Sequence, residues 1–330
     1  MKTIALDAMG GDNAPNEIIK GAVEALMDIT YNIALVGKEE VIKAQLEKYS
    51  YDKERITVVN ADEVIENCET PTTAIKQKKN SSMVIGLNMV KKGEADAFVS
   101  AGNTGALLTG STIIVGRIKG IERPALGTLL PTEKGVTMML DSGANVDAKA
   151  SYLPQYAIMA SIYVENVLGI KNPKVGLVNI GAEKEKGNAM VKEAYGLLEA
   201  TPNINFVGNT EARDITKGDV DVIVCDAFVG NVILKLMEGF GSTMLKILKT
   251  ELLGDFLSKI GALLSKKAFK RILKRFSYDD KGGAPFLGLK GLVVKAHGSS
   301  DYKAIKGAIN QCASFLDKDI VNKIAENLQN

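Results

Sequence analysis

Six short segments of the sequence combine glycine with asparagine or an acidic residue, and each follows an apolar run typical of a strand. Glycine lets the backbone approach a ligand closely, and a helix N-terminus offers free N–H groups to an anion. In open α/β sheets, ligands bind beyond the carboxyl ends of the strands. One such segment alone is an ordinary strand-to-helix turn, but six in one sheet favour a binding site. They are Asp7–Asn13, Ser100–Ala106, Asp141–Asn145, Asn179–Asn188, Asp226–Asn231 and His297–Asp301.

The common nucleotide-binding fingerprints are absent from the sequence. No G-x-G-x-x-G motif follows the first apolar run, and no G-x-x-x-x-G-K-[ST] motif occurs anywhere. Dinucleotide sites and ordinary nucleoside triphosphate sites are therefore disfavoured.

Three side chains in these segments have the chemistry of a catalytic site, and each has a simpler structural alternative. Lys186 lies at the start of an expected helix, where a cation opposes the helix dipole, so we interpret it as directed at a phosphate. The alternative is a solvated lysine in a charged loop, as expected for Lys184. Asn231 either hydrogen-bonds a substrate or caps the helix expected over Val232–Lys249. His297 either binds substrate or is a neutral histidine satisfied by backbone groups.

Apolar runs alternate with helical patterns along the chain, which predicts βαβ units and an α/β fold, a mostly parallel sheet with helices on both faces. No proline-rich linker occurs, so residues 1–330 are expected to form one composite domain. The expected strands are Lys2–Ala8, Tyr31–Val36, Arg55–Asn60, Ala95–Ser100, Leu126–Pro131, Gly135–Leu140, Lys174–Ile180, Ile204–Val207, Val220–Cys225 and Gly291–Lys295. The expected helices include Pro15–Asp28, Lys38–Tyr49, Ser81–Lys92, Asn103–Val115 and Val232–Lys249.

The composition limits the classes of function. The chain of 330 residues has 41 Lys and Arg against 39 Asp and Glu, a net charge of +2, which argues against a nucleic-acid partner. Cys68, Cys225 and Cys312 lie far apart and His297 is the only histidine, so neither a disulfide framework nor a metal site is expected. The chain reaches Asp7 before a signal-peptide apolar region could form, and it contains no run of about 18 apolar residues. We expect a reduced, cytoplasmic, globular protein.

One segment is both strongly basic and amphipathic. Residues 246–275 contain nine Lys and Arg against Glu251 and Asp255, a net charge of +7, although the whole chain carries only +2. Leucine, isoleucine and phenylalanine recur there at helical spacing. Such a segment suits an anionic membrane surface, and the alternatives are a core-packed or dimer-forming helix pair or contact with an acidic protein. Residues 250–276 are predicted to be a protruding helical insertion with membrane or dimer contacts through Leu253, Phe256, Leu257, Ile260, Leu264, Lys266, Lys267, Lys270 and Arg271.

Taken together and in order along the chain, the motifs resemble those of the phosphate acyltransferases of bacterial phospholipid synthesis, the PlsX family. The motifs that carry this resemblance span nearly the whole chain. They are Ile4–Asp12, Ser100–Ala106, Glu122–Ala125, Asp141–Asn145, Asn179–Gly181 followed by Lys186–Asn188, Gly208–Asp214, Gly230–Asn231, Gly282–Pro285 and His297–Ser300.

The resemblance implies reversible transfer of a long-chain fatty acyl group from acyl carrier protein to inorganic phosphate. The product would be acyl phosphate, which a membrane-embedded glycerol-3-phosphate acyltransferase consumes. The resemblance also implies a homodimer, a fold similar to isopropylmalate dehydrogenases and phosphotransacetylases, and peripheral attachment to the inner face of the cell membrane. It points to Lys186 and Asn231 as catalytic residues and implies no metal or organic cofactor.

Phosphate is already anionic at neutral pH, so no serine or cysteine nucleophile is required, and the enzyme must mainly position groups and stabilise an oxyanion. We expect Lys186 and loop N–H groups to hold phosphate and Asn231 to donate to the thioester oxygen. The alternatives are a phosphotransacetylase-like enzyme that uses acyl-coenzyme A, and a non-catalytic lipid-binding or membrane-scaffold protein. The expected residues of the substrate and phosphate site are Asp7, Gly10, Gly11, Asp12, Gly102, Asn103, Thr104, Gly105, Asp141, Asn145, Gly187, Asn188, Asp226 and His297.

Overall fold

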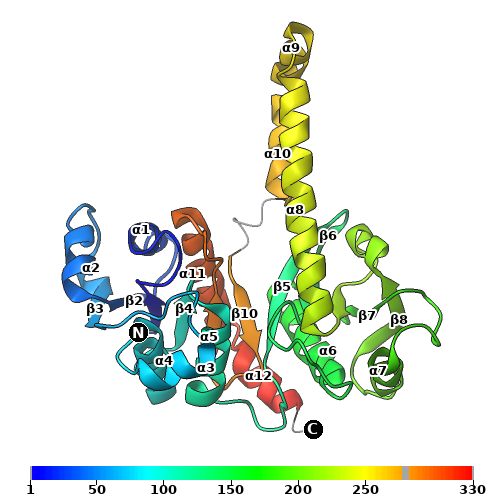
Figure 1. Cartoon of the computed structure of the whole chain (residues 1–330), viewed down its shortest axis with the longest axis horizontal. Coiled ribbons are helices and arrows are strands. Elements are labelled where there is room, and N and C mark those ends of the chain that lie inside the picture. The colour runs from blue at the N-terminus through cyan, green and yellow to red at the C-terminus, as the bar shows by residue number, and fades with distance from the viewer. Residues whose placement is uncertain (1, 277–281, 329–330) are drawn as a thin grey trace.

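The computed structural model describes residues 2–276 and 282–328 and shows one sheet of eleven strands with helices on both sides (Figure 1). The strand order is β3-β2-β1-β4-β11-β10-β5-β6-β9-β7-β8. The strands are β1 (Thr3–Asp7), β2 (Asn32–Gly37), β3 (Ile56–Asn60), β4 (Ala97–Ser100), β5 (Ala125–Thr132), β6 (Gly135–Leu140), β7 (Lys174–Asn179), β8 (Asn205–Glu211), β9 (Val222–Val224), β10 (Ala284–Leu287) and β11 (Leu292–Lys295). The predicted mostly parallel α/β sheet is confirmed.

The sheet consists of two parallel blocks that run in opposite directions. Strands β1 to β4 and β11 are parallel to one another, and so are β6, β7, β8 and β9. Between the blocks, β10 is antiparallel to both β11 and β5, and β5 is antiparallel to β6. The carboxyl ends of the two blocks therefore point in opposite directions along the sheet.

Twelve α-helices are described, in addition to short 3₁₀ and π segments. They are α1 (Asn16–Ala25), α2 (Glu39–Leu46), α3 (Pro71–Gln77), α4 (Ser82–Lys92), α5 (Thr104–Gly110), α6 (Tyr152–Tyr163), α7 (Ala189–Glu199), α8 (Ala227–Leu252), α9 (Phe256–Leu264), α10 (Lys266–Phe276), α11 (Tyr302–Asp317) and α12 (Ile320–Asn327). The helix expected to run to Val115 is α5 continued by a π-helical segment, Ser111–Val115.

Alternate residues of each strand belong to the cores on the two faces, as expected when a strand is covered on both sides. On β5, Ala125 belongs to the core formed with α1, α2, α6, α7, α11 and α12. Leu126 belongs to the core formed with α3, α4 and α5, and Leu130 to the core beneath the first turns of α8. The starts of α5 and α8 therefore lie on the same face of the sheet.

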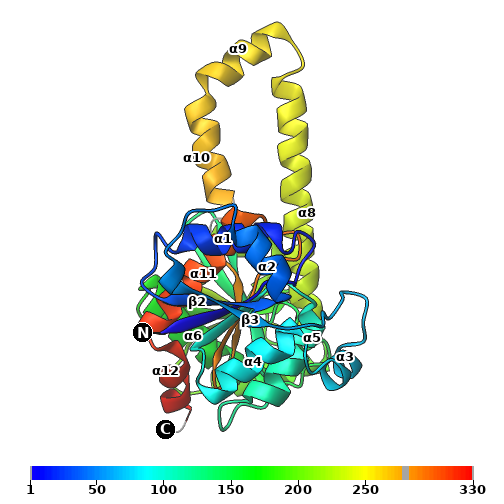
Figure 2. The same cartoon turned by 90° about the vertical axis from the view of Figure 1, so that its left-hand side faces the viewer.

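The helices α8, α9 and α10 form an arch that rises from the body (Figure 2). α8 has 26 residues, a length of about 39 Å at the usual helical rise, and only Ala227, Gly230 and Ile233 of it are buried. It begins five residues earlier than the predicted Val232, so a single helix connects the body to the tip. α9 crosses the top and α10 returns, which agrees with the predicted protruding helical segment.

Candidate functional site

The six glycine-containing loops lie in one sheet, as expected, but they do not share one edge. The loops after β1, β4 and β11 form a first group, because these three strands are parallel neighbours. The loops after β6, β9 and β7 form a second group in the oppositely directed block. Within the described residues, no hydrogen bond or ion pair joins the two groups. The predicted site residues are therefore divided into two sets.

The first group is held together by short backbone contacts. The Asp12 N–H donates to the carbonyl oxygen of Gly298 at 2.8 Å, which joins the β1 loop to the β11 loop. A side chain at Gly10 would overlap the carboxylate of Asp7 and the backbone nitrogen of Gly102, so glycine is required where the β1 and β4 loops meet. Gly11 is also in these loops, and Thr104 and Gly105 are the first two residues of α5.

Asp7 and Asn103, predicted to bind substrate, have structural partners in the first group. The Asp7 carboxylate is buried and accepts from the Ser100 hydroxyl at 2.7 Å and from the Met9 N–H at 3.2 Å. Burial raises the pKa of Asp7, and the hydrogen bonds from Ser82 and Ser100 oppose that shift. The Asn103 side chain caps α5 by accepting from Ala106 N–H at 3.0 Å. These contacts position the loops rather than presenting free groups to a ligand.

The second group is organised around the buried carboxylate of Asp141. It accepts from the backbone N–H groups of Leu126, Gly143, Ala144 and Asn145 and from the Asn145 side chain. Burial raises the pKa of Asp141, and these hydrogen bonds lower it. Asp141 and Asn145 thus shape their loop, and the Asn145 carbonyl accepts from Ala227 N–H at 3.1 Å, which joins this loop to the start of α8.

Asn231 is not the cap of its helix, so the capping alternative considered from the sequence is wrong. Asp226 is the N-cap of α8, and its carboxylate accepts from Val229 N–H at 2.9 Å. Asn231 lies in the second turn and is half-buried. In the described part of the chain its side-chain amide has no hydrogen-bond partner. Asn231 is therefore available to a ligand, whereas Asp226 is occupied.

Gly230 fixes how closely α8 approaches the Asp141 loop, because a Cβ atom there would overlap the carbonyl oxygen of Asp141. Gly230→Ala is expected to destabilise the protein by about 1–3 kcal/mol, since the helix start or the loop must move. Gly239→Ala on the same helix is the matched control, because a Cβ atom added at Gly239 would have no neighbour within 4 Å. That control should be neutral or stabilising by up to about 1 kcal/mol. Thermal unfolding of both variants measures the difference, and equal melting temperatures would contradict this account.

Lys186 is exposed in the loop between β7 and α7. Asn188 caps α7 by accepting from Val191 N–H at 2.9 Å. The backbone carbonyl of Lys186 accepts from the Asn179 side chain at 3.1 Å, so the loop is anchored although the Lys186 side chain is free. Gly187 follows it in the left-handed region with φ +97. Within the described residues, Lys186 forms no ion pair.

Lys184, two residues earlier, is exposed in this charged loop, as expected, and it also has charged and aromatic neighbours. Its ammonium pairs with Glu199 at 2.5 Å and lies 5.0 Å from the Tyr195 ring centroid. The hydrogen bond from Lys184 to Glu199 raises the pKa of Lys184. Lys184 is therefore occupied by a surface ion pair, whereas Lys186 forms no ion pair among the described residues.

His297 is exposed in the β11 loop, and its contacts are local. The Ser299 N–H donates to the ring Nδ1 at 3.3 Å, and the Ser299 hydroxyl lies 2.8 Å from the same atom. A neutral ring that accepts at Nδ1 carries its proton on Nε2. The hydrogen bond from the Ser299 N–H partly agrees with the alternative of a histidine satisfied by backbone groups.

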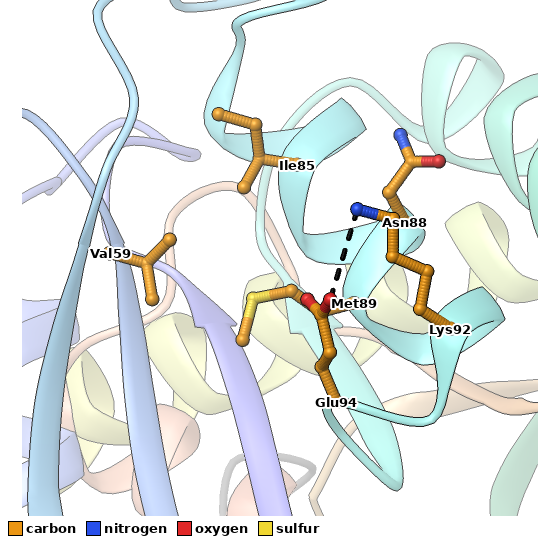
Figure 3. Close-up of a pocket in the computed structure, with 6 residues that line it drawn as sticks. All are labelled: Val59, Ile85, Asn88, Met89, Lys92 and Glu94. Carbon is orange, nitrogen blue, oxygen red and sulfur yellow. Dashed lines mark ion pairs between the residues drawn. The ribbon is translucent and has the colours of Figure 1, made fainter.

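Other candidate groups do not form a site in the described residues. No group of three or more His, Cys, Asp or Glu side chains there could hold a metal ion. Burial raises the pKa of both Cys225 and Cys312, which disfavours the thiolate form that a nucleophile needs. A hollow of about 400 Å³ beside β3 and α4 lies away from the glycine loops (Figure 3). Its lysine, Lys92, forms an exposed ion pair with Glu94 at 3.8 Å.

One charged residue in the first group was missed by the sequence analysis. Lys295 ends β11, its side chain is 9% exposed, and its ammonium donates to the carbonyl oxygens of Ala101 and Ala296. A signal was present, because a lysine directly follows the buried run Leu292–Val294. The neighbouring strands β1 and β4 also end in polar residues, Asp7 and Ser100.

The arch presents the residues predicted for membrane or partner contacts. Leu253, Phe256, Leu257, Ile260 and Leu264 are all exposed large apolar residues. Lys266, Lys267, Lys270 and Arg271 are exposed on the first half of α10. The side chains of residues 273–276, also part of the predicted segment, lie outside the described residues. No helix in the described chain has the length and apolar character needed to cross a membrane.

Comparison with known proteins identifies the family. The family model described as "Fatty acid synthesis protein" matches residues 2–323. A phosphate acyltransferase from Clostridium acetobutylicum is 50% identical over 327 residues, which are 99% of this chain and 98% of that protein. A phosphate acyltransferase from Alkaliphilus oremlandii is 52% identical over 323 residues, 98% of this chain and 96% of that protein.

The solved structure of a phosphotransacetylase from Streptococcus pyogenes matches with a TM-score of 0.63 at 16% identity, over 95% of this chain and 93% of that one. This likeness concerns the fold and confirms the phosphotransacetylase-like architecture expected from the sequence. The matches to the phosphate acyltransferases extend over almost the entire chain, so the assignment to a family does not depend on any one loop. The chain belongs to the fatty acid synthesis protein family, together with these phosphate acyltransferases.

Proposed function

We propose that the protein transfers a long-chain fatty acyl group from the thioester of acyl carrier protein to inorganic phosphate, reversibly, giving acyl phosphate for phospholipid synthesis. The family and its relatives support acyl transfer to phosphate. In the structure, the observation that supports the proposal is that Lys186 and Asn231 follow neighbouring parallel strands. Lys186 is in the loop after β7 and Asn231 is in the second turn of α8, which follows β9, and both side chains lack partners among the described residues.

In this reaction a phosphate oxygen attacks the thioester carbon, and a tetrahedral oxyanion forms. A carbon–oxygen bond to phosphate replaces the carbon–sulfur bond, and the carrier protein leaves as a thiolate that takes up a proton. Lys186 holds the phosphate by a charge-assisted hydrogen bond, and the Asn231 amide donates to the oxygen that gains charge. The enzyme contributes position and electrostatic stabilisation rather than a covalent intermediate.

The remaining predicted residues support this chemistry indirectly. Asp7, Asp141 and Asp226 are buried and already accept hydrogen bonds, so they position loops. Backbone N–H groups of the glycine loops, together with His297, are the groups left to contact the phosphate or the arm of the carrier protein, whereas the Asp12 carboxylate accepts from the Asn67 side chain at 3.3 Å. No metal or organic cofactor takes part in the proposed reaction.

The direct test is to incubate the purified protein with palmitoyl-acyl carrier protein, with and without inorganic phosphate, and to trap acyl phosphate with hydroxylamine. Phosphate-dependent product from this donor is expected, and little from palmitoyl-coenzyme A. Product from coenzyme A alone would instead favour a phosphotransacetylase-like enzyme. No product from either donor, with lipid binding retained, would favour a non-catalytic scaffold.

We also infer that the protein works as a homodimer at the cytoplasmic face of the membrane. Acyl phosphate carries a long apolar chain, and a membrane glycerol-3-phosphate acyltransferase would consume it there. The arch supports this inference because its tip combines exposed Leu257 and Leu264 with basic α10, a combination that binds anionic lipid surfaces. Further down α8, exposed Leu236 and Phe240 offer an apolar face to a second copy.

Replacement of both tip leucines, Leu257→Glu with Leu264→Glu, is expected to weaken binding to vesicles containing anionic phosphatidylglycerol at least about tenfold, since apolar burial is lost and negative charge added. Co-sedimentation measures this, and turnover in solution should be retained. Met27→Glu is the matched control, because Met27 and Leu257 are each 78% exposed. If the double variant sediments like the control, the tip does not bind the membrane.

A further inference from the structure

Lys295 lies where the three loops of the first group meet. Its ammonium donates to the carbonyl oxygen of Ala101 in the β4 loop at 3.1 Å and to that of Ala296 in its own loop. Ala296 directly precedes His297 and Gly298, and Gly298 accepts from the Asp12 N–H of the β1 loop. One side chain is thus connected, directly or through one backbone contact, to the loops after β1, β4 and β11.

The strand register places three polar side chains in one row at this point. Lys295 and Ser100 are register partners on β11 and β4, and Ser100 donates to Asp7 at the end of β1. Because side chains alternate between the faces of a sheet, all three lie on the α4 and α5 face, two residues beyond Ala5, Phe98 and Val293 of that core. The row consists of an anion, a hydroxyl and a cation beneath the glycine loops.

A buried ammonium at this place is costly for folding. Desolvation lowers the pKa of Lys295 to about 8, and the negative charges of Asp7 and Asp12 act in the opposite direction. An apolar side chain would fill the same space without that cost. Among the described residues, Asp7 and Asp12 are the titratable groups that act on its charge. An ammonium has three N–H donors, and the structure shows protein partners for two of them.

We propose that Lys295 is a positioning residue for the anionic substrate: its ammonium holds the three loops in one arrangement and supplies the positive charge that allows a phosphate group to bind beside Asp7 and Asp12. This inference rests on the proposed phosphate acyltransferase function. The chemistry recognised is a phosphate group: either the phosphodiester in the arm of acyl carrier protein or, if that substrate binds in the first loop group rather than at Lys186, inorganic phosphate. Lys295 acts through the loops, since its side chain is nearly inaccessible to solvent.

The test compares Lys295→Met, which removes charge and donors, with Lys295→Arg, which keeps both. For Lys295→Met we expect the KM of one phosphate-bearing substrate to rise about tenfold or more, with a smaller change in kcat, as for loss of a hydrogen bond to a charged group. A raised KM for inorganic phosphate identifies that ligand, and a raised KM for acyl carrier protein identifies the phosphodiester. An unchanged KM for both substrates overturns the proposal.

A pH profile separates the charge from a purely structural role. In the wild-type enzyme, kcat/KM for the affected substrate is expected to fall as pH rises through about 8, where Lys295 loses its proton. Lys295→Arg should move this decline to higher pH, because the guanidinium stays protonated. Titration of phosphate itself affects both enzymes equally. If the decline is at the same pH in both enzymes, Lys295 is only a tether and the charge role is wrong.

Stability gives a second readout with a defined sign. The folded pKa of Lys295 lies below the ordinary lysine value of 10.5, so the folded state binds fewer protons between about pH 8 and that value. Relative to Lys295→Met, the wild-type protein should therefore become more stable as pH rises through this window. Near pH 7 the variant should melt no lower than the wild type, so lost activity would not reflect unfolding. A variant that melts lower throughout, with unchanged affinity, would contradict the inference.

Failure of the inference is distinguishable from failure of the proposed function. Calorimetric titration with inorganic phosphate measures binding without turnover, and a weaker affinity in Lys295→Met supports the inference when phosphate is the ligand. If the wild-type enzyme makes acyl phosphate and Lys295→Met equals it in every readout, the proposed function stands and Lys295 has no part in it. A wild-type protein that makes no acyl phosphate from either donor refutes the function itself.

Discussion

Asn231→Ala is expected to lower kcat about 10²–10³-fold while the protein folds normally. This is the usual effect of removing one hydrogen-bond donor from an oxyanion site. The structure makes the prediction sharper, because Asp226 rather than Asn231 caps α8 and the Asn231 amide has no partner among the described residues. Its loss should therefore leave the free energy of unfolding within about 0.5 kcal/mol of the wild-type value. Steady-state turnover with palmitoyl-acyl carrier protein measures the first effect, and thermal unfolding the second.

Lys235→Ala is the matched control, since Lys235 is exposed on the same helix one turn later. Its turnover should equal that of the wild type. A comparable loss in both variants would indicate that α8 as a whole was disturbed. Unchanged turnover in Asn231→Ala would remove this residue from the mechanism.

Lys186→Ala is expected to raise the KM for inorganic phosphate about 10–100-fold and to lower kcat as well. A hydrogen bond to a charged group contributes about 1.5–3 kcal/mol, and the ammonium is the charge available to phosphate in this loop. The side chain is exposed and forms no ion pair within the described part of the chain, so its removal should cost little stability. Initial rates over a range of phosphate concentrations measure the change.

Lys184→Ala is the control for charge in the same loop. Lys184 pairs with Glu199, so its removal affects a surface ion pair and should leave the phosphate KM near the wild-type value. If both variants raise the KM equally, the effect belongs to the general positive charge of the loop. A normal phosphate dependence in Lys186→Ala would exclude it from phosphate binding.

Much of the fold could be predicted because its signals are local. All ten expected strands form, since continuous apolar runs bounded by glycine or asparagine are typical of strands buried on both faces. The missed strand is β10, Ala284–Leu287, which contains Pro285 and follows two glycines. Proline and glycine disfavour strands locally. β10 forms because its backbone pairs with both β11 and β5, a tertiary interaction with no local signature.

The candidate site was less predictable than the fold. Lys186 could be singled out because a cation at a helix start opposes the helix dipole, and the family resemblance pointed to Lys186 and Asn231 together. The roles of Asp7, Asn103, Asp141 and Asp226 could not be separated from ligand binding, because caps and anchored carboxylates use the same residue types as binding sites. Their hydrogen-bond partners decide the question, and the structure shows that those partners belong to the protein.

The sequence by itself determined the α/β class, the family, the glycine loops at strand ends and the amphipathic arch, all of which depend on neighbouring residues. Only the tertiary structure decided which loops meet, because strand order and direction follow from pairing between segments far apart in the chain. Lys295 is the plainest example: its hydrogen-bond partner Ala101 is 194 residues away. A lysine at the end of an apolar run becomes a buried cation beside two carboxylates only when β11 pairs with β4, since burial and charge are properties of the assembled neighbourhood.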